Sequence, residues 1–184
     1  MKKIAIYHNL TSGGSKRELF EFTRRFNKSG FTIHLYGHHE EKSTYLDLTN
    51  WVSEINIIRF NFIKKISFTL PFLKSIINLF IDMINFQKID NVSNLMAKDI
   101  DGKNYDFVFV HHNKEYVQSP FILKYIKSKT VYFCNEPFRQ FYETGIFKNN
   151  IKENKTKGFM RLYSTLTDLV DKPCINFINN KIKD

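Results

Sequence analysis

A strand, a pair of glycines and a helix follow one another at the start of the chain, and no other feature narrows the possible folds as much. Residues 4–7 form an apolar run that ends in polar residues and then in Gly13 and Gly14, which is typical of a buried strand that enters a tight loop. Residues 31–36 alternate in the manner of a second strand. Two strands joined by a helix form the unit from which parallel sheets are built. We therefore expect a three-layer α/β fold, in which helices cover both faces of a parallel sheet.

The segment between these two strands carries helix signals at both ends. Ser15 and Glu18 have the spacing of a capping box, in which each side chain hydrogen-bonds the backbone of the other residue. Gly30 provides the left-handed residue that ends many helices. Residues three and four apart form one apolar face: Leu19, Phe22 and Phe26. These signals predict a helix that starts near Ser15 and packs on the sheet.

The alternation of strands and helices continues through the middle of the chain. Residues 55–60, 106–110 and 130–134 predict three more strands. Residues 120–127 predict a helix that crosses between the last two. Residues 145–184 are more polar and predict a helical extension of the same domain, since a chain of 184 residues has the length of one domain.

The segment after Pro71 predicts an amphipathic helix with two alternative partners. Its apolar face consists of Leu73, Ile76, Ile77, Phe80 and Ile84. This face either packs on the sheet or docks on an anionic membrane, together with the neighbouring Lys64 and Lys65. The apolar stretch is interrupted by Lys74 and Asp82, so it falls short of the ~20 apolar residues of a membrane-spanning helix.

The chain is strongly basic, with a net charge of +10. Such a charge attracts anionic partners of any class. However, nothing resembles a recognition helix, an aromatic RNA-binding sheet or a zinc module, so we expect no nucleic-acid partner. The start of the chain lacks the apolar stretch of a secretory signal, and Cys134 and Cys174 lack the spacing of a metal site or a disulfide framework. We expect a cytoplasmic protein without a bound metal or cofactor.

Three polar segments follow predicted strands: residues 11–16, 111–114 and 135–139. Ligands of open α/β sheets bind beside the carboxyl ends of the strands, so these segments contain the candidate site residues. In the first segment, Gly13 and Gly14 precede a helix whose N-terminal backbone N–H groups suit a phosphate or a substrate hydroxyl. The alternative is that the two glycines form only a tight turn.

Two histidines, His111 and His112, end the strand predicted at residues 106–110. An imidazole there, with only solvent or a ligand ahead of it, could hydrogen-bond a substrate hydroxyl or a developing charge near neutral pH. The alternative is a histidine that bonds a loop carbonyl. His8 has the same position after the first strand. Three more histidines are expected at the surface: His34, His38 and His39.

The third segment places Asn135, Glu136 and Arg139 around Pro137 at a strand end. The carboxylate and the guanidinium either contact a substrate or pair with each other and hold the loop. Three polar strand ends that converge on one edge of a parallel sheet favour the functional interpretation.

Several of these segments resemble the N-terminal half of family 4 glycosyltransferases. Residues 13–17, GGSKR leading into a helix, are similar to the glycine-rich loop after the family's first strand. Residues 105–111, YDFVFVH, look like a family strand that ends in a histidine beside the transferred sugar. Residues 131–143 are similar to a subgroup pattern in which a strand is followed by Glu-Pro, an arginine and Tyr-Glu. The resemblance covers residues 3–143.

The resemblance implies a GT-B enzyme, in which two Rossmann-like domains face each other. Residues 1–184 would be the N-terminal, acceptor-side domain, and the C-terminal donor domain would lie outside this chain. Gly13 and Gly14 would approach the donor phosphates or the acceptor. His111 would line the reaction centre, with His112 as its alternative if the strand end shifts by one residue. The further substrate-binding residues would be Lys16, Asn135, Glu136 and Arg139.

The implied activity is transfer of a sugar, with retention of its anomeric configuration, from a nucleotide-sugar donor to a glycan or a lipid-linked acceptor. The donor is a substrate, so no cofactor is implied. The expected partner is a donor domain, either in the same protein or in a separate subunit of a split transferase. The alternative function is a non-catalytic module that binds a partner protein or an anionic membrane, at the inner face of the plasma membrane.

Overall fold

The computed structural model describes residues 2–38, 41, 45–59, 61–67, 71–111 and 120–135. Its elements in chain order are β1 (Lys3–Tyr7), α1 (Gly14–Lys28), β2 (Thr32–Gly37), the 3-10 turn η2 (Thr49–Trp51), β3 (Glu54–Ile57), α2 (Pro71–Gly102), β4 (Phe107–His111), α3 (Ile122–Tyr125) and β5 (Thr130–Phe133). The helical extension predicted for residues 145–184 lies outside the described residues.

The five strands form one sheet, all parallel, in the order β3-β2-β1-β4-β5. This arrangement confirms the predicted parallel sheet. From β1 the chain extends the sheet through β2 to β3, and it then crosses to the other side of β1 with β4. Ligands of such sheets bind at this switch point, beside the carboxyl ends of the strands where the order reverses. The carboxyl ends of β1 and β4 therefore mark where a site belongs.

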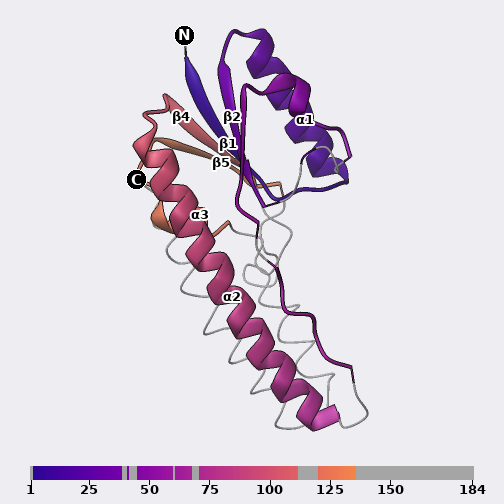
Figure 1. Ribbon diagram of the computed structural model, residues 1–184. Coiled ribbons are helices and arrows are strands. Elements are labelled where there is room, and N and C mark those ends of the chain that lie inside the picture. The colour runs from indigo at the N-terminus through magenta and orange to yellow at the C-terminus, as the bar shows by residue number, and fades with distance from the viewer. Residues whose placement is uncertain are drawn as a thin grey trace, which may run out of the picture.

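Helices cover both faces of the sheet, as predicted (Figure 1). Ile4 and Ile6 of β1 join the core under α1, whereas Ala5 and Tyr7 join the core under α2 and α3. This division follows from the two-residue period of a strand. The predicted apolar face of α1 contributes to the first core through Leu19, Phe22 and Phe26.

Helix α1 differs from its prediction at the first turn. It begins at Gly14, and its N-cap is Gly13, with φ 91° and ψ −174°. Ser15 therefore lies inside the first turn, and the predicted capping box is wrong because the cap position has no side chain. At the other end Gly30 has φ 81°, which confirms the left-handed stop.

Helix α2 is much longer than the sequence predicts. Its 32 residues span about 48 Å at a rise of 1.5 Å per residue. Figure 1 shows that the C-terminal half lies against the sheet and that the N-terminal half extends well beyond it. The residues buried on the sheet are Met96, Ala97 and Ile100.

The predicted apolar face of this helix does not pack on the sheet. Leu73, Phe80 and Ile84 are 47%, 60% and 46% exposed, because they lie in the half that extends past the strands. Among the described residues, no helix combines the length and the apolar character needed to cross a membrane.

Candidate functional site

Three elements bring side chains to one corner of the sheet: the N-terminus of α1 and the carboxyl ends of β4 and β5. His111, the last residue of β4, pairs with Phe133 of β5. The Phe133 ring lies 5.3 Å from the His111 ring and 5.0 Å from the Phe22 ring of α1. His111 and Phe133 therefore face α1, at the edge where a ligand of such a sheet is expected.

Glu18 and Asn135 meet at this corner. Asn135 Nδ2 donates a hydrogen bond to the Glu18 carboxylate. Glu18 lies one helical turn before Phe22, on the same face of α1, so its carboxylate reaches past the ends of β4 and β5. The sequence predicted Asn135 as a site residue but assigned Glu18 to the cap of α1. A contact between residues 117 positions apart has no local signal.

Gly13 and Gly14 form the exposed turn between β1 and α1. Gly13 has a positive φ that side chains rarely adopt, whereas Gly14 is helical. A Cβ atom built on Gly14 meets no atom within 4 Å. A ligand could therefore approach the backbone at Gly14 directly, as binding of a phosphate or a substrate hydroxyl to the backbone N–H groups requires.

His111 is buried, contrary to the prediction of an imidazole with only solvent or a ligand ahead of it. Its exposed fraction is 0%. Among the described residues, its ring packs at the strand end 6.4 Å from the Phe109 ring and 5.3 Å from the Phe133 ring. A catalytic role for His111 thus requires that a ligand displace some of the residues that now cover its imidazole.

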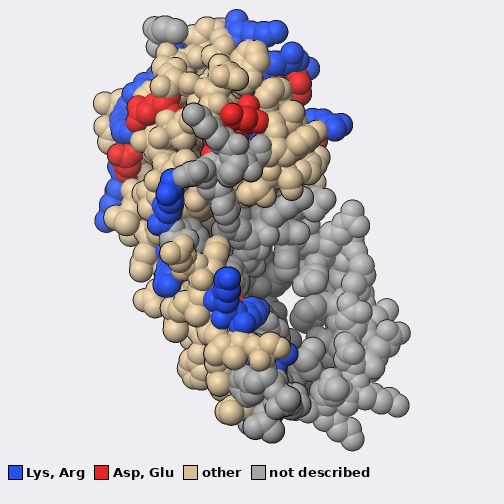
Figure 2. Space-filling view, turned by 45° about the vertical axis from the view of Figure 1, so that its right-hand side comes forward, with Lys and Arg blue, Asp and Glu red and all other residues tan. Residues whose placement is uncertain are grey.

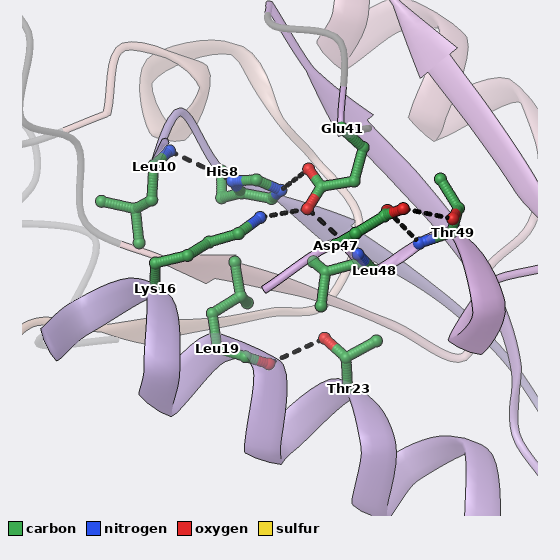
Figure 3. A network of polar contacts seen from close by, with 9 residues as sticks. All are labelled: His8, Leu10, Lys16, Leu19, Thr23, Glu41, Asp47, Leu48 and Thr49. Atoms are coloured by element: carbon green, nitrogen blue, oxygen red, sulfur yellow. Dashed lines mark hydrogen bonds and ion pairs between the residues drawn. The ribbon is translucent and has the colours of Figure 1, made fainter. Parts of the chain in front are cut away.

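Lys16 lies in a buried network on the other side of the β1–α1 turn (Figure 3). Its ammonium pairs with Glu41 Oε1, and the backbone N–H of Leu48 donates to the same oxygen over 3.2 Å. His8 Nε2 lies 3.3 Å from the other carboxylate oxygen. Lys16, Glu41 and His8 are 0%, 3% and 5% exposed. The residue predicted to bind substrate is therefore held in the interior by Glu41.

The hydrogen bonds of His8 define its tautomer. The backbone N–H of Leu10 donates to His8 Nδ1 over 3.1 Å, so Nδ1 carries no proton. The ring proton is then on Nε2, where it faces Glu41. Burial alone would raise the pKa of the Glu41 carboxyl, but the hydrogen bonds from His8 and Lys16 and the positive charges that these two groups carry in acid outweigh burial and lower it to about 2. Glu41 is therefore ionised at neutral pH.

The same network fastens the segment after β2 onto the β1–α1 turn. Besides the bonds of Glu41, the Tyr45 backbone N–H donates to the Thr11 carbonyl over 2.9 Å. Arg17 Nη2 donates to the Tyr45 hydroxyl over 3.3 Å. The turn that contains Gly13 and Gly14 is thus anchored from inside by Lys16 and from outside by Tyr45. An anchored turn presents its backbone to a ligand with little loss of conformational entropy on binding.

His34 and His38 are also buried, at 8% and 6% exposure, so their predicted surface position is wrong. Each ring is held by polar partners inside the fold, which compensates its burial. His38 Nδ1 donates to the Ile58 carbonyl over 3.1 Å, and the Tyr7 hydroxyl lies 3.2 Å from His38 Nε2. His34 Nδ1 lies 2.8 Å from a Glu54 carboxylate oxygen. His39 is outside the described residues.

Glu41 belongs to no motif, so no local pattern selects it as a site residue. A general signal did exist. The segments that follow neighbouring parallel strands meet at one edge of the sheet, so an acidic residue after β2 is a natural partner for Lys16 after β1. Which of several acidic residues takes that place depends on the loop conformation.

The remaining predicted site residues, His112, Glu136 and Arg139, lie outside the described residues. Within the described part of the chain, no group of three or more His, Cys, Asp or Glu side chains is arranged to hold a metal ion. The candidate site therefore consists of Gly13, Gly14, Glu18, His111 and Asn135, which we call the switch-point corner. The Lys16–Glu41–His8 network supports it from one side.

No protein-family model matches this chain, and no curated protein matches it. A solved structure with some likeness is the C-terminal domain of a hydrogenase from Pyrococcus furiosus. It is 12% identical, with a TM-score of 0.44 over 71% of this chain and 89% of that domain. A likeness at this level carries no argument about function, and the α/β assignment comes from the strand order and register.

Proposed function

We propose that this chain is the acceptor-binding half of a retaining glycosyltransferase of the GT-B type. One observation carries the proposal. Gly14, His111 and Asn135 come from three distant segments that resemble the family, and they lie at one corner of the sheet, beside its switch point. This is the edge at which α/β sheets bind their ligands.

The switch-point corner offers groups that suit sugar hydroxyls. A carboxylate accepts hydrogen bonds, and a side-chain amide both donates and accepts them, so Glu18 and Asn135 can together bind neighbouring hydroxyls. The exposed backbone at Gly14 adds a place for a hydroxyl or a phosphate oxygen. In the proposed reaction the bond from the sugar's anomeric carbon to the nucleotide diphosphate breaks. A bond from that carbon to an acceptor oxygen forms, and the acceptor hydroxyl loses its proton.

The donor nucleotide would be bound by a second domain, supplied in the same protein or by a separate subunit. The acceptor would be a glycan or a lipid-linked sugar. This division follows from the proposed GT-B architecture, and it allows the acceptor side to be tested on this chain by itself.

The test is saturation-transfer NMR of the whole chain with a panel of oligosaccharides, followed by Gly14→Val. A side chain at position 14 has open space, so the variant should fold normally and still block ligand approach to the backbone. We expect a bound saccharide whose affinity falls at least about tenfold, because the added side chain keeps the ligand from the backbone N–H and leaves a polar group of the ligand without that hydrogen bond. Gly102→Val is the matched control, because it is equally open but ends α2 at the opposite edge of the sheet. Equal binding by Gly14→Val and the parent, or no binding of any saccharide, would contradict the proposal.

Sugar transfer itself is tested with a donor domain fused to the chain or added as a separate protein. Activity that needs both parts supports the transferase, and activity with the separate protein supports the split form. Saccharide binding without transfer in either arrangement would favour a non-catalytic binding module.

A further inference from the structure

Asn9 and His38 lie two residues beyond Tyr7 and Tyr36, on the side of the sheet that α2 covers. Tyr7 and Tyr36 are partners in the β1–β2 ladder, and both belong to the core under α2 and α3. Since side chains of an extended chain alternate between two faces, residues 9 and 38 return to that face. The Tyr7 hydroxyl bonds both of them, over 3.0 Å to Asn9 Nδ2 and 3.2 Å to His38 Nε2. The three side chains form one hydrogen-bonded series at the carboxyl ends of β1 and β2.

The hydrogen bonds of this series run in one direction. A carbonyl oxygen only accepts, so His38 Nδ1 carries the proton that it donates to the Ile58 carbonyl over 3.1 Å. In the neutral imidazole Nε2 then has no proton, and the Tyr7 hydroxyl donates to it. The Tyr7 oxygen in turn accepts from Asn9 Nδ2. The tautomer of His38 thus determines how the Asn9 amide is turned, with Nδ2 towards Tyr7 and Oδ1 away from it.

The Oδ1 atom of Asn9 is an acceptor that the fold does not satisfy. Asn9 is 5% exposed, and within the described part of the chain no group donates a hydrogen bond to its Oδ1. Burial of an acceptor without a donor is costly, so nearly all such groups in folded proteins have a partner. The donor for Asn9 Oδ1 therefore has to come from outside the described residues.

The position of Asn9 favours a ligand as the source of this donor. Asn9 follows β1, which lies between β2 and β4 at the point where the strand order reverses. Ligands of such sheets bind beside these strand ends. The Tyr7 and His38 bonds also orient the amide before any ligand arrives, so little conformational entropy is lost on binding.

The chemistry of the amide oxygen and the charge of the chain select a hydroxyl. A neutral acceptor can bind a hydroxyl or an ammonium group. Blue basic side chains are spread over the described surface in Figure 2, and the net charge of +10 repels a cationic ligand. We propose that Asn9 Oδ1 accepts a hydrogen bond from a ligand hydroxyl on the α2 side of the carboxyl edge, on the other face of the sheet from the switch-point corner. This inference rests on the proposed function, because it takes the ligand to be a saccharide.

The test is a thermodynamic cycle with the methyl glycosides of glucose, galactose and mannose and their singly deoxygenated analogues, by NMR titration of the whole chain. We expect one deoxygenated analogue to bind the parent about tenfold more weakly than its hydroxylated form, and the same two compounds to bind Asn9→Leu equally. Leucine has nearly the size of asparagine and lacks its polar atoms. Thr23→Val is the matched control, since it removes a buried hydroxyl that donates to the Leu19 carbonyl within α1. It should keep the tenfold difference.

The outcomes separate this inference from the proposed function. Glycoside binding that Gly14→Val weakens and Asn9→Leu leaves unchanged would overturn the inference alone. No glycoside binding by the parent would overturn both. Equal affinities of the parent and Asn9→Leu, with a long-lived water next to the Asn9 Nδ2 protons in water–protein NOE spectra, would assign Oδ1 to an internal water only.

The direction of the series is tested without any ligand. The ring ¹⁵N shifts of His38 at neutral pH should show a proton on Nδ1 and none on Nε2. A proton on Nε2 would reverse the bond to Tyr7, leave Oδ1 of Asn9 free to accept from the Tyr7 hydroxyl, and overturn the proposal.

Discussion

At the residue scale, the switch-point corner depends on charges that are buried beside it. Lys16 is fully buried, and burial lowers the pKa of its ammonium while Glu41 and Asp47 oppose that shift. Its ion pair with Glu41 is the condition for keeping a charge at this position. Any change that removes one partner leaves the other buried without its counter-charge.

Replacing the carboxylate should therefore be costly. We expect Glu41→Gln to lower the free energy of unfolding by about 3–5 kcal/mol, measured by urea denaturation at neutral pH. Glu21→Gln is the control, because Glu21 forms an exposed pair with Arg24 and should contribute less than about 1 kcal/mol. Similar losses in the two variants would show that burial does not govern the Glu41 pair.

The lowered pKa of Glu41 also predicts how the free energy of unfolding depends on pH. The pKa of Glu41 falls from its ordinary 4.5 to about 2 on folding. Its contribution is complete above about pH 4.5 and is lost as the pH falls towards 2, because the unfolded chain binds the proton first. We expect urea midpoints of the parent to fall over this range and those of Glu41→Gln to fall less. Parallel pH profiles would contradict the assignment.

At the element scale, two asparagines join the N-terminal half of α2 to the extended segment of residues 61–67: Asn85 bonds the backbone N–H and carbonyl of Ile63, and Asn78 bonds those of Ile66. Asn85 is fully buried and Asn78 is partly exposed. Loss of the Asn85 pair leaves the Ile63 backbone groups without two hydrogen bonds in a partly buried position. Loss of the exposed pair is compensated by solvent.

Hydrogen exchange of the Ile63 and Ile66 amides measures this difference. Asn85→Ala should speed exchange of the Ile63 amide by about tenfold or more, and Asn78→Ala should speed exchange of the Ile66 amide by less than about threefold. Both residues lie on the same side of one helix, so each variant is the control of the other. Equal effects would mean that residues 61–67 are held by their own side chains and not by the hydrogen bonds of Asn78 and Asn85.

Most elements could be predicted from the sequence, and the exceptions have physical reasons. The strands at residues 3–7, 32–37 and 107–111 are apolar runs or alternating stretches, which are strong local signals. The full length of α2 had no such signal, because the stretch before Gly102 mixes polar residues with few apolar ones that touch the sheet. The pattern also predicted an apolar face near Phe80 correctly but not what that face contacts.

The candidate site shows the same limit. Its location could be predicted because the carboxyl ends of parallel strands lie at one edge of the sheet. The segments that contain Gly14, His111 and Asn135 follow such strand ends and therefore meet there. Glu18 and Glu41 were not predicted as its polar partners, because their contacts join residues far apart in the chain. Local spacing assigned Glu18 to a cap that the glycine turn does not form.

At the scale of the whole molecule, a series of hydrogen-bonded side chains joins α2 to the sheet. The Tyr36 hydroxyl donates to Asp99 of α2 over 2.8 Å and lies 3.0 Å from the Tyr105 hydroxyl. Since a carboxylate only accepts, the Tyr36 proton points at Asp99, and Tyr105 donates to Tyr36. Tyr105 in turn lies 3.0 Å from His34 Nδ1. These hydrogen bonds hold the C-terminal half of α2 over β2.

The two halves of α2 should consequently differ in stability within one native molecule. The half beside the sheet buries Met96, Ala97 and Ile100 in the main core, whereas the described side chains of residues 71–86 include two buried ones, Ile81 and Asn85. Local opening is easiest where little apolar surface is buried. Residues 71–86 should therefore open without unfolding of the sheet.

Native-state hydrogen exchange in low urea tests this division. We expect amides of residues 76–84 to exchange through an opening at least about 2 kcal/mol less costly than that of residues 96–100, with a smaller dependence on urea. The amides of β1 and β4 should follow residues 96–100, because they share the core under α2 and α3. If both halves of α2 showed the same opening free energy and urea dependence, the helix would be one cooperative unit. Residues 71–86 would then be as firmly part of the fold as the sheet, and their exposed apolar side chains would have to be explained without local opening.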